Sequence, residues 1–257
     1  MVTMMDIWKQ YESRLNVHGA TQKQVTENRE ARFLSKRVKN SLSDFDVIIY
    51  PTKHTFNLTE QYDYRDSENV VIIKSDNLDE KVIITLPPYD IAVGSLVNWQ
   101  NSYWLVDKRD SNTTLYTQGT LKQCNYLLKW VNKDNKIIEQ WCVIEDGTKY
   151  LIGEYQDNRF ITIRGDSRVA LWVPANDETK ALNRTYHFYI NDMCYNLTKP
   201  LKGNLGYDHG EYYKYMLQEC TGNIYDNKEL GIADYYKHFP KEDNNPTIPN
   251  NGKKVWL

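Results

Sequence analysis

The sequence predicts a mainly β protein, a barrel or sandwich of short antiparallel strands, with an N-terminal helical arm and an extended C-terminal tail. Aromatic residues make up 13% of the chain and include 20 Tyr and 7 Trp, and aromatic side chains are enriched in strands. Short runs of β-branched and aromatic residues recur at close spacing between turn-forming residues, which favours a barrel or sandwich over β-α-β units. Helical periodicity is concentrated at the N-terminal end of the chain.

These observations divide the 257 residues into three segments. Residues 1–42 are expected to form the helical arm, residues 43–221 the β body, and residues 222–257 the tail. A chain of this length suits either one all-β domain with appendages or two small domains. Two β subdomains, 43–120 and 121–221, are therefore one option for the body.

Two helices are expected in the arm. The first, Met5–Asn16, has one apolar stripe and is ended by Gly19. The second, Thr21–Asn40, opens with the pattern Thr21-x-x-Gln24, which is typical of a capping box, and it contains no Gly or Pro. The apolar stripe of the first helix consists of Ile7, Trp8, Tyr11 and Leu15.

The second helix has a thin apolar face and a basic opposite side. One interpretation is a solvated helix with a single packed edge. The other is a docking arm, which has too little apolar surface to be satisfied within its own chain and enough positive charge to select an acidic partner. On this second interpretation, the candidate assembly residues of the helix are Arg29, Arg32, Lys36 and Arg37.

The body is expected to consist mostly of strands. Leu121–Trp141 is the clearest element, because two apolar strands flank the turn Asn132–Asn135 and Asn and Asp tolerate left-handed backbone angles. Thr52–Asn69 is expected to be a long loop, Glu145–Thr148 a hairpin turn, and Pro174–Asn183 to contain one helical turn. The other expected strands are Val47–Tyr50, Val70–Lys74, Val82–Leu86, short strands within Val93–Leu121, Tyr150–Tyr155, Phe160–Arg164, Val169–Val173, Tyr186–Ile190, Cys194–Thr198 and Tyr212–Cys220. Of these, Tyr186–Ile190 and Cys194–Thr198 are expected to form a hairpin around Asn191 and Asp192.

The tail, residues 222–257, is rich in Asn, Asp, Lys and Pro, and one short helix is expected at Leu230–His238. It ends in three apolar residues, Val255, Trp256 and Leu257. These residues either fold back onto the body or add to a partner. We include them among the candidate assembly residues.

The charge of the chain is unevenly distributed. Residues 1–42 hold eight Lys or Arg against four Asp or Glu, residues 223–257 hold five of each, and the whole chain has a net charge of −2. The arm therefore carries +4 and the body between these segments −6. A dedicated nucleic-acid binder would instead concentrate positive charge on its folded surface.

No catalytic signature is present, and we expect neither an enzyme nor a bound metal or cofactor. The chain lacks the H-x-H, H-E-x-x-H, G-x-S-x-G, P-loop and G-x-G-x-x-G patterns. His187 lies in an aromatic strand and is interpreted as a structural residue. His209 stands beside Asp208 and Glu211, where it either belongs to a turn or binds a metal or carries a proton.

The four cysteines, Cys124, Cys142, Cys194 and Cys220, each lie in an apolar run. They lack the close pairing of zinc ligands. We expect them to be free and buried, as small hydrophobic residues. A bridge between Cys124 and Cys142 across the hairpin is the alternative, and the lack of a signal sequence disfavours it.

An alternative function is a carbohydrate-binding or glycan-acting β module. Such a module would use exposed tryptophans as a platform for sugar rings, or a pair of carboxylates for cleavage. The tryptophans fall inside apolar runs, which favours a place in the core. The candidate platform residues are Trp99, Trp104, Trp130 and Trp141.

Five sequence blocks carry a resemblance to a known family. In chain order, they resemble neck proteins of tailed phages of Gram-positive hosts, which are head-closure or head–tail connector components. The resemblance extends over Met5–Cys220 and rests on aromatic strands rather than on reactive residues. The blocks are YESRLNVHGAT (11–21), VGSLVNWQNSYWLV (93–106), QCNYLLKW (123–130), ALWVPANDETKALNRTYHFYI (170–190) and YNLTKP (195–200).

The resemblance implies a virion structural protein that is assembled in the host cytoplasm and located in the neck. Its partners would be further copies of itself in a sixfold or twelvefold ring, the portal or adaptor protein, and the tail terminator or tube protein. Double-stranded DNA would pass through the ring with non-specific contact, which suits an acidic body. No membrane partner is expected, because no apolar run is long enough for a membrane-spanning helix.

Overall fold

The structure is a computed structural model that describes residues 4–15, 19, 21–54, 56–57, 67–87, 89–110, 115–146, 168–201 and 210–240. Four expectations lie outside the described residues. They are the strands Tyr150–Tyr155 and Phe160–Arg164, the site at His209, and the apolar end of the tail at Val255, Trp256 and Leu257.

The described chain is mainly β, as expected, and its helices are few and short. The helices are α1 (Met4–Leu15), α2 (Gln22–Lys39), α3 (Asp177–Ala181) and α4 (Tyr235–His238). The strands are β1 (Asp44–Tyr50), β2 (Phe56–Asn57), β3 (Glu68–Lys74), β4 (Glu80–Thr85), β5 (Leu96–Trp99), β6 (Ser102–Asp110), β7 (Thr117–Gln123), β8 (Tyr126–Val131), β9 (Ile137–Asp146), β10 (Arg168–Pro174), β11 (His187–Ile190), β12 (Met193–Leu201) and β13 (Tyr212–Cys220).

Six strands of the first half form a closed antiparallel barrel in the order β1-β3-β4-β7-β6-β5. Strand β5 closes the barrel by pairing with β1, with Ile48 opposite Asn98 and Tyr50 opposite Leu96. Closure leaves no free strand edge. The barrel is filled by Val47, Val70, Ile72, Ile83, Ile91, Val97, Trp104, Val106 and Leu121.

The second sheet has seven strands. Six follow the order β11-β12-β13-β10-β9-β2, and the seventh, β8, also pairs with β9. The predicted β8–β9 hairpin is confirmed, with a register from Tyr126 opposite Cys142 to Val131 opposite Ile137. In its turn, Asn135 has a φ of 57°. The predicted β11–β12 hairpin is also confirmed. Its turn residues, Asn191 and Asp192, have φ values of 47° and 65°.

This second sheet curls until β11 approaches β8. The Tyr126 hydroxyl donates a hydrogen bond of 3.1 Å to the Tyr189 carbonyl. The Trp130 ring meets Phe188 edge-on, with ring centroids 6.3 Å apart. The curl encloses a core of Leu128, Trp130, Ile138, Cys142, Leu171, Val173, Leu182, Phe188, Ile190, Tyr195, Leu197, Tyr213, Tyr215 and Leu217.

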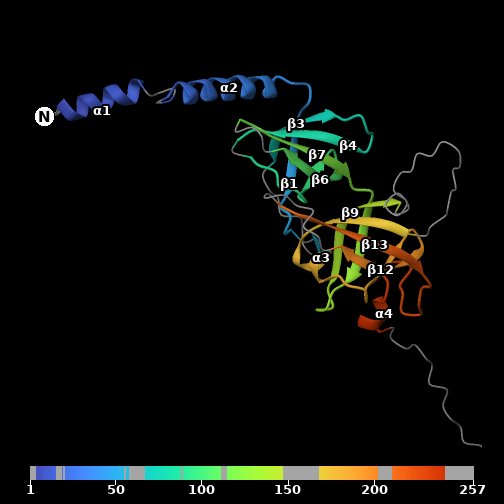
Figure 1. The fold of residues 1–257 in the computed structure, drawn as a ribbon. Coiled ribbons are helices and arrows are strands. Elements are labelled where there is room, and N and C mark those ends of the chain that lie inside the picture. The colour runs from blue at the N-terminus through green and yellow to red at the C-terminus, as the bar shows by residue number, and fades with distance from the viewer. Residues whose placement is uncertain are drawn as a thin grey trace, which may run out of the picture.

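Strands β9, β10 and β13 each contribute side chains to two cores, because a further core joins this sheet to the barrel. Successive side chains of a strand point to opposite faces. In β10, Leu171 and Val173 therefore enter the core of the second sheet, whereas Ala170 and Trp172 enter the shared core. Figure 1 shows the barrel and the second sheet packed against each other. The shared core consists of Tyr50, Val93, Leu96, Leu105, Cys124, Val143, Ala170, Trp172 and Tyr212.

Two expectations about turns and loops differ from the structure in its described part. Thr52–Asn69, expected to be one long loop, contains strand β2, in which Phe56 pairs with Glu139 of β9, while residues 55 and 58–66 lie outside the described residues. A pairing with a strand so distant in sequence leaves no local signal. Glu145 and Asp146 continue strand β9 instead of forming a turn, because they pair with Ala170 and Val169 of β10.

The expectation of an extended tail from residue 222 is wrong for residues 222–240, which are folded. Ile232 and Ala233 are buried, and Ile232 forms a two-way backbone bridge with Asn227. The segment ends in α4, within the predicted helical range Leu230–His238. Two buried apolar residues in a polar sequence are enough to attach this segment to the body. Residues 241–257 lie outside the described part of the chain.

Asn176 joins the barrel side of the chain to the second sheet, which gives a first prediction. It is buried, and its side-chain amide donates to the Gln140 side chain at 2.9 Å and to the His54 carbonyl at 3.2 Å. Its side-chain oxygen caps α3 by accepting from the Thr179 amide. Replacing Asn176 with Ala removes the cap and leaves buried polar partners unsatisfied. We expect a loss of roughly 2–4 kcal/mol in the free energy of unfolding, measured by urea denaturation.

The matched control for Asn176→Ala is Asn183→Ala. In its turn, the Asn183 side-chain oxygen accepts hydrogen bonds from the amide and the hydroxyl of Thr185, and both bonds are exposed to solvent. Its replacement should cost less than about 1 kcal/mol. Equal losses for the two variants would contradict the role assigned to Asn176.

Candidate functional site: the N-terminal arm and the groove at its base

The arm consists of α1 and α2, which project from the barrel side of the body (Figure 1). The predicted capping box is confirmed at the start of α2. The Gln24 amide donates to the Thr21 hydroxyl, and the Thr21 amide donates to the Gln24 side chain, both at 3.3 Å. Helix α2 has no buried residue. Local sequence, rather than packing on the body, therefore determines most of this helix.

Apolar side chains are exposed along the length of the arm. Trp8 is 63% exposed and Phe33 is 59% exposed. Ile7, Trp8 and Tyr11 lie on one side of α1, since residues three and four apart share a helix face. An isolated helix as short as α1, with 12 residues, is marginal in water without packing of such a face. The arm therefore has the character of an unpartnered contact surface.

The four basic candidate residues lie on this helix, and all are exposed. Arg29 and Arg37 flank Phe33 one turn before and one turn after it, and Lys36 lies three residues beyond it. Such neighbours surround a central side chain on a helix surface. None of the four forms an ion pair with another residue that the structure describes. The result is an exposed aromatic ring among cations.

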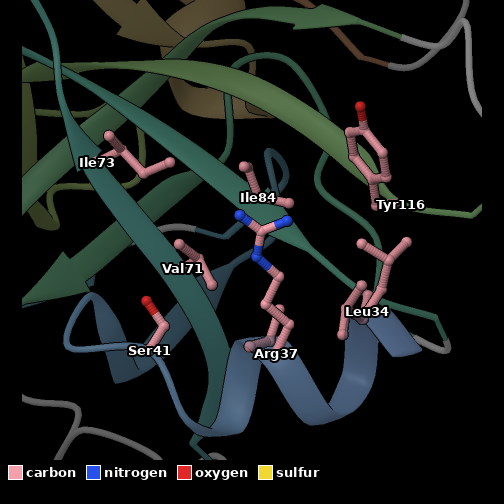
Figure 2. A pocket seen from close by; sticks show the side chains of 9 residues that line it. Leu34, Arg37, Ser41, Val71, Ile73, Ile84 and Tyr116 are labelled. Atoms are coloured by element: carbon pink, nitrogen blue, oxygen red, sulfur yellow. The ribbon is translucent and has the colours of Figure 1, made fainter. Parts of the chain in front are cut away.

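A groove of about 360 Å³ lies where α2 meets the barrel (Figure 2). Leu34 and Val38 of α2 contribute one wall. The outer face of β3 and β4 contributes the other, and Arg37 extends from α2 over this face (Figure 2). The residues that line the groove are Leu34, Arg37, Val38, Ser41, Val71, Ile73, Ile84, Leu86 and Tyr116.

The sequence pointed to the basic face of α2 but not to this groove. Its walls come from segments far apart in the chain, and no spacing rule connects Leu34 with Ile84. The sequence held one signal for the groove, since β3 and β4 carry apolar residues on both faces. A barrel strand with one face in water needs apolar residues only on the face that points into the barrel. Ile73 remains 43% exposed. The other candidate residues, Val255, Trp256 and Leu257, lie beyond the described residues.

A polar cluster surrounds Trp172 at the junction of barrel and second sheet. The ammonium groups of Lys122 and Lys214 each lie 4.4 Å from the centre of the Trp172 ring. Lys122 is ion-paired with Glu145. Such cation–π contacts are strongest where water is excluded. The cluster neutralises charges at the boundary between the two cores.

Lys214 was considered as a catalytic group, because a lysine with a lowered pKa can act as a nucleophile or base. Burial lowers the pKa of Lys214 to about 8, and the nearby positive charge of Lys122 acts in the same direction against the opposing effect of Glu145. Its ammonium is occupied by the Trp172 ring, however, and it lines neither of the two cavities described in this section. The geometry supports a structural role.

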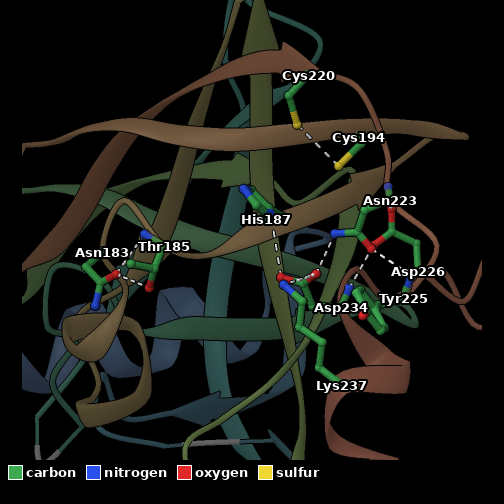
Figure 3. Close-up of polar contacts among 10 residues, drawn as sticks. All are labelled: Asn183, Thr185, His187, Cys194, Cys220, Asn223, Tyr225, Asp226, Asp234 and Lys237. Carbon is green, nitrogen blue, oxygen red and sulfur yellow. Dashed lines mark hydrogen bonds and ion pairs between the residues drawn. The ribbon is translucent and has the colours of Figure 1, made fainter. Parts of the chain in front are cut away.

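A second cavity, of about 210 Å³, lies beside α4. Figure 3 shows its polar neighbourhood, in which Asp234 is the hub. Asp234 accepts from Asn223 at 2.6 Å and pairs with Lys237 at 2.7 Å and with His187 at 3.4 Å. Burial alone would raise the pKa of Asp234, but the bonds from Lys237 and Asn223 and the nearby His187 outweigh it, so the pKa is lowered. The contact with His187 of β11 joins residues 222–240 to the second sheet, whereas those with Asn223 and Lys237 hold the segment together internally.

No group of three or more His, Cys, Asp or Glu among the described residues has an arrangement that could hold a metal ion. His187 contacts Asp234 at 3.4 Å.

All four cysteines are free, as expected, but Cys220 is only partly buried, unlike the other three. Cys124 and Cys142 are buried, and burial raises the pKa of both thiols. Cys194 and Cys220 face each other across β12 and β13, with their sulfurs 3.3 Å apart. Burial, together with Cys220 and the nearby acidic residues, raises the pKa of Cys194 to about 12. A thiol with a raised pKa is a poor nucleophile.

The candidate sugar platform has little exposed area. Trp104 is 4% and Trp130 is 1% exposed. Trp99 packs on Phe45 and Trp104. Trp141 stacks on Tyr103 with ring centroids 4.9 Å apart. These four rings pack in the cores and at the junction between the barrel and the second sheet.

The lowered pKa of Lys214 gives a second prediction. Between pH 8 and the ordinary value of 10.5, the unfolded chain holds a proton that the folded chain has released. The stability of the wild type should therefore rise with pH in this window, relative to a variant that cannot titrate there. We expect the free energy of unfolding of K214M, relative to that of the wild type, to be higher at pH 7 than at pH 10. Urea denaturation at several pH values measures this difference.

K214R is the matched control, because arginine keeps the charge but does not titrate in this range. K214M and K214R should differ by a constant amount across the pH series. A wild type whose stability runs parallel to both variants would show that the Lys214 pKa is not lowered.

Comparisons with family models, with curated proteins and with solved structures return no match for this chain. Among the described residues, the helices are too short or too polar to cross a lipid bilayer.

Proposed function

We propose that this chain is a structural subunit of the head–tail connector of a tailed phage. Copies form a ring that joins the portal or adaptor protein to the tail and lines or closes the DNA channel. The observation that carries the proposal is the arm, which holds exposed apolar and basic side chains away from a body that encloses three apolar cores.

The exposed side chains of the arm are better explained by assembly than by a chain that stays monomeric in solution. Apolar surface that leaves water contributes roughly 25 cal/mol per Å², and the rings of Trp8, Tyr11 and Phe33 would supply much of that area. These side chains find no cover on their own body. A partner surface would provide it.

A ring is the assembly that this shape suits. The arm and the body present different surfaces, so contacts between copies are heterologous, and heterologous contacts generate rings when the rotation closes. The arm is basic and the body acidic, with net charges of +4 and −6. Opposite charges steer an arm towards the body of a neighbour and keep like surfaces apart.

The phage neck is supported by the resemblance of the sequence blocks to neck proteins. An acidic body also fits a channel through which DNA passes, because strong neutralisation of phosphates would hold the DNA in place. Neck location in the virion, assembly in the host cytoplasm, and contacts with portal and tail proteins belong to this proposal.

Deleting residues 1–40 tests the proposal. We expect the full chain to form rings in electron micrographs and a large species in sedimentation velocity. The truncated chain should keep its strand content by circular dichroism and sediment as a monomer. Rings of unchanged size after truncation would remove the arm from the interface.

A full-length variant tests the effect of the charge of the arm separately from the effect of deleting the arm. Reversing Arg29, Arg32, Lys36 and Arg37 to Glu should lower the fraction of chain in rings, and raising the salt concentration should weaken wild-type assembly. Assembly that is indifferent to both would contradict a charge-guided arm.

A further inference from the structure

We propose that the groove at the base of α2 binds helix α1 from a second copy of this chain. The inference rests on the proposed ring and names the contact that links one subunit to the next. Each copy contributes one arm tip and one groove, so the contact repeats head to tail around the ring.

The groove has the properties of a site that receives a side chain. Its walls are apolar, with Leu34 and Val38 from the arm and Val71, Ile73 and Ile84 from the barrel. Figure 2 shows Leu34, Val71 and Ile84 arranged around the opening between α2 and the sheet. At about 360 Å³, the space admits an aromatic ring together with a neighbouring aliphatic side chain.

Helix α1 presents the complementary ridge. Trp8 and Tyr11 lie with ring centroids 6.0 Å apart and form a single aromatic edge, with Ile7 beside them. All three side chains are more than half exposed. An amphipathic helix that places anchors three and four residues apart into an apolar groove is a recurrent mode of recognition.

Charge complements the apolar fit. Glu12 lies four residues after Trp8, so it stands on the same side of α1, one turn along. Arg37 lies at the groove, one turn after Phe33. Both side chains are exposed, and neither forms an ion pair with any residue in the described part of the chain. A docked α1 that inserts Trp8 would bring Glu12 towards the rim that carries Arg37.

The occupant is assigned to a second copy because of where α1 lies. Figure 1 shows α1 at the far end of the arm, beyond α2 and away from the body. Helix α2 begins at Gln22 and its first groove residue is Leu34, so α2 separates α1 from its own groove by about 18 Å at 1.5 Å per residue. An arm of this length carries Trp8 to a neighbour.

The test measures assembly of full-length chains by sedimentation velocity and electron microscopy. E12R and R37E should each weaken assembly about tenfold, since like charges then face each other at the contact. The E12R/R37E double variant should recover most of the wild-type assembly, because every interface then carries the pair in reversed order. Failure of the double variant to recover would overturn the Glu12–Arg37 contact.

Trp8 and Ile73 test the apolar part of the contact. W8A should weaken assembly about thirtyfold as an aromatic anchor, while alanine preserves the helix. K9A is its matched control, since Lys9 faces away from the stripe, and it should assemble like the wild type. I73S, on the groove wall, should weaken assembly as W8A does. The two losses should not add in the W8A/I73S double variant, as expected for residues in contact.

The outcomes separate this inference from the ring proposal. A monomeric wild type would overturn both. A wild type that forms rings, loses them on deletion of residues 1–40, and keeps them in W8A and I73S would overturn only the groove. A W8A variant with a lower melting temperature and unchanged assembly would show that α1 folds back onto its own chain, which also overturns the inference.

Discussion

The architecture depends on a sheet that has no solvent face over much of its area. Strands β9, β10 and β13 alternate between two cores, so that Leu171 belongs to one core and Trp172 to the other. Strand β9 adds a stacked pair between Trp141 and Tyr103 of the barrel. Because these strands also contribute to the core shared with the barrel, the barrel and the second sheet cannot separate without exposing the apolar surface of that core. The body therefore acts as one support.

That support determines what the arm can do. Helix α2 is attached to the body by a short link, after which the Ser43 carbonyl accepts a hydrogen bond from the Ile72 amide at 2.9 Å. Only its last turns, through Leu34 and Val38, meet the barrel. The remainder of the arm is held by its own hydrogen bonds and by the capping box at Thr21. A rigid base with a projecting helix is an arrangement suited to reaching a neighbour, and it leaves the groove open at the root of the same helix.

Several titratable groups among the described residues stabilise contacts between segments of the body. Asp234 binds Asn223 and Lys237 within the segment 222–240 and links this segment to the second sheet through His187. Lys122 and Lys214 cover the Trp172 ring at the junction. The polar chemistry thus lies where segments meet. The most exposed aromatic residues, Trp8, Tyr11 and Phe33, lie in contrast on the arm, where partners rather than substrates would meet them.

The sequence by itself determined the local elements. Periodicity of 3.6 residues and the Thr21–Gln24 pair decided the arm, and Asn-rich turns decided the β8–β9 and β11–β12 hairpins, because both signals act between residues close in the chain. Only the tertiary structure decided the rest. The pairing of β2 with β9, the continuation of β9 through Glu145, and the burial of Ile232 each depend on partners distant in sequence. The groove has the same origin, since Leu34 and Ile84 become neighbours only when the barrel closes beneath α2.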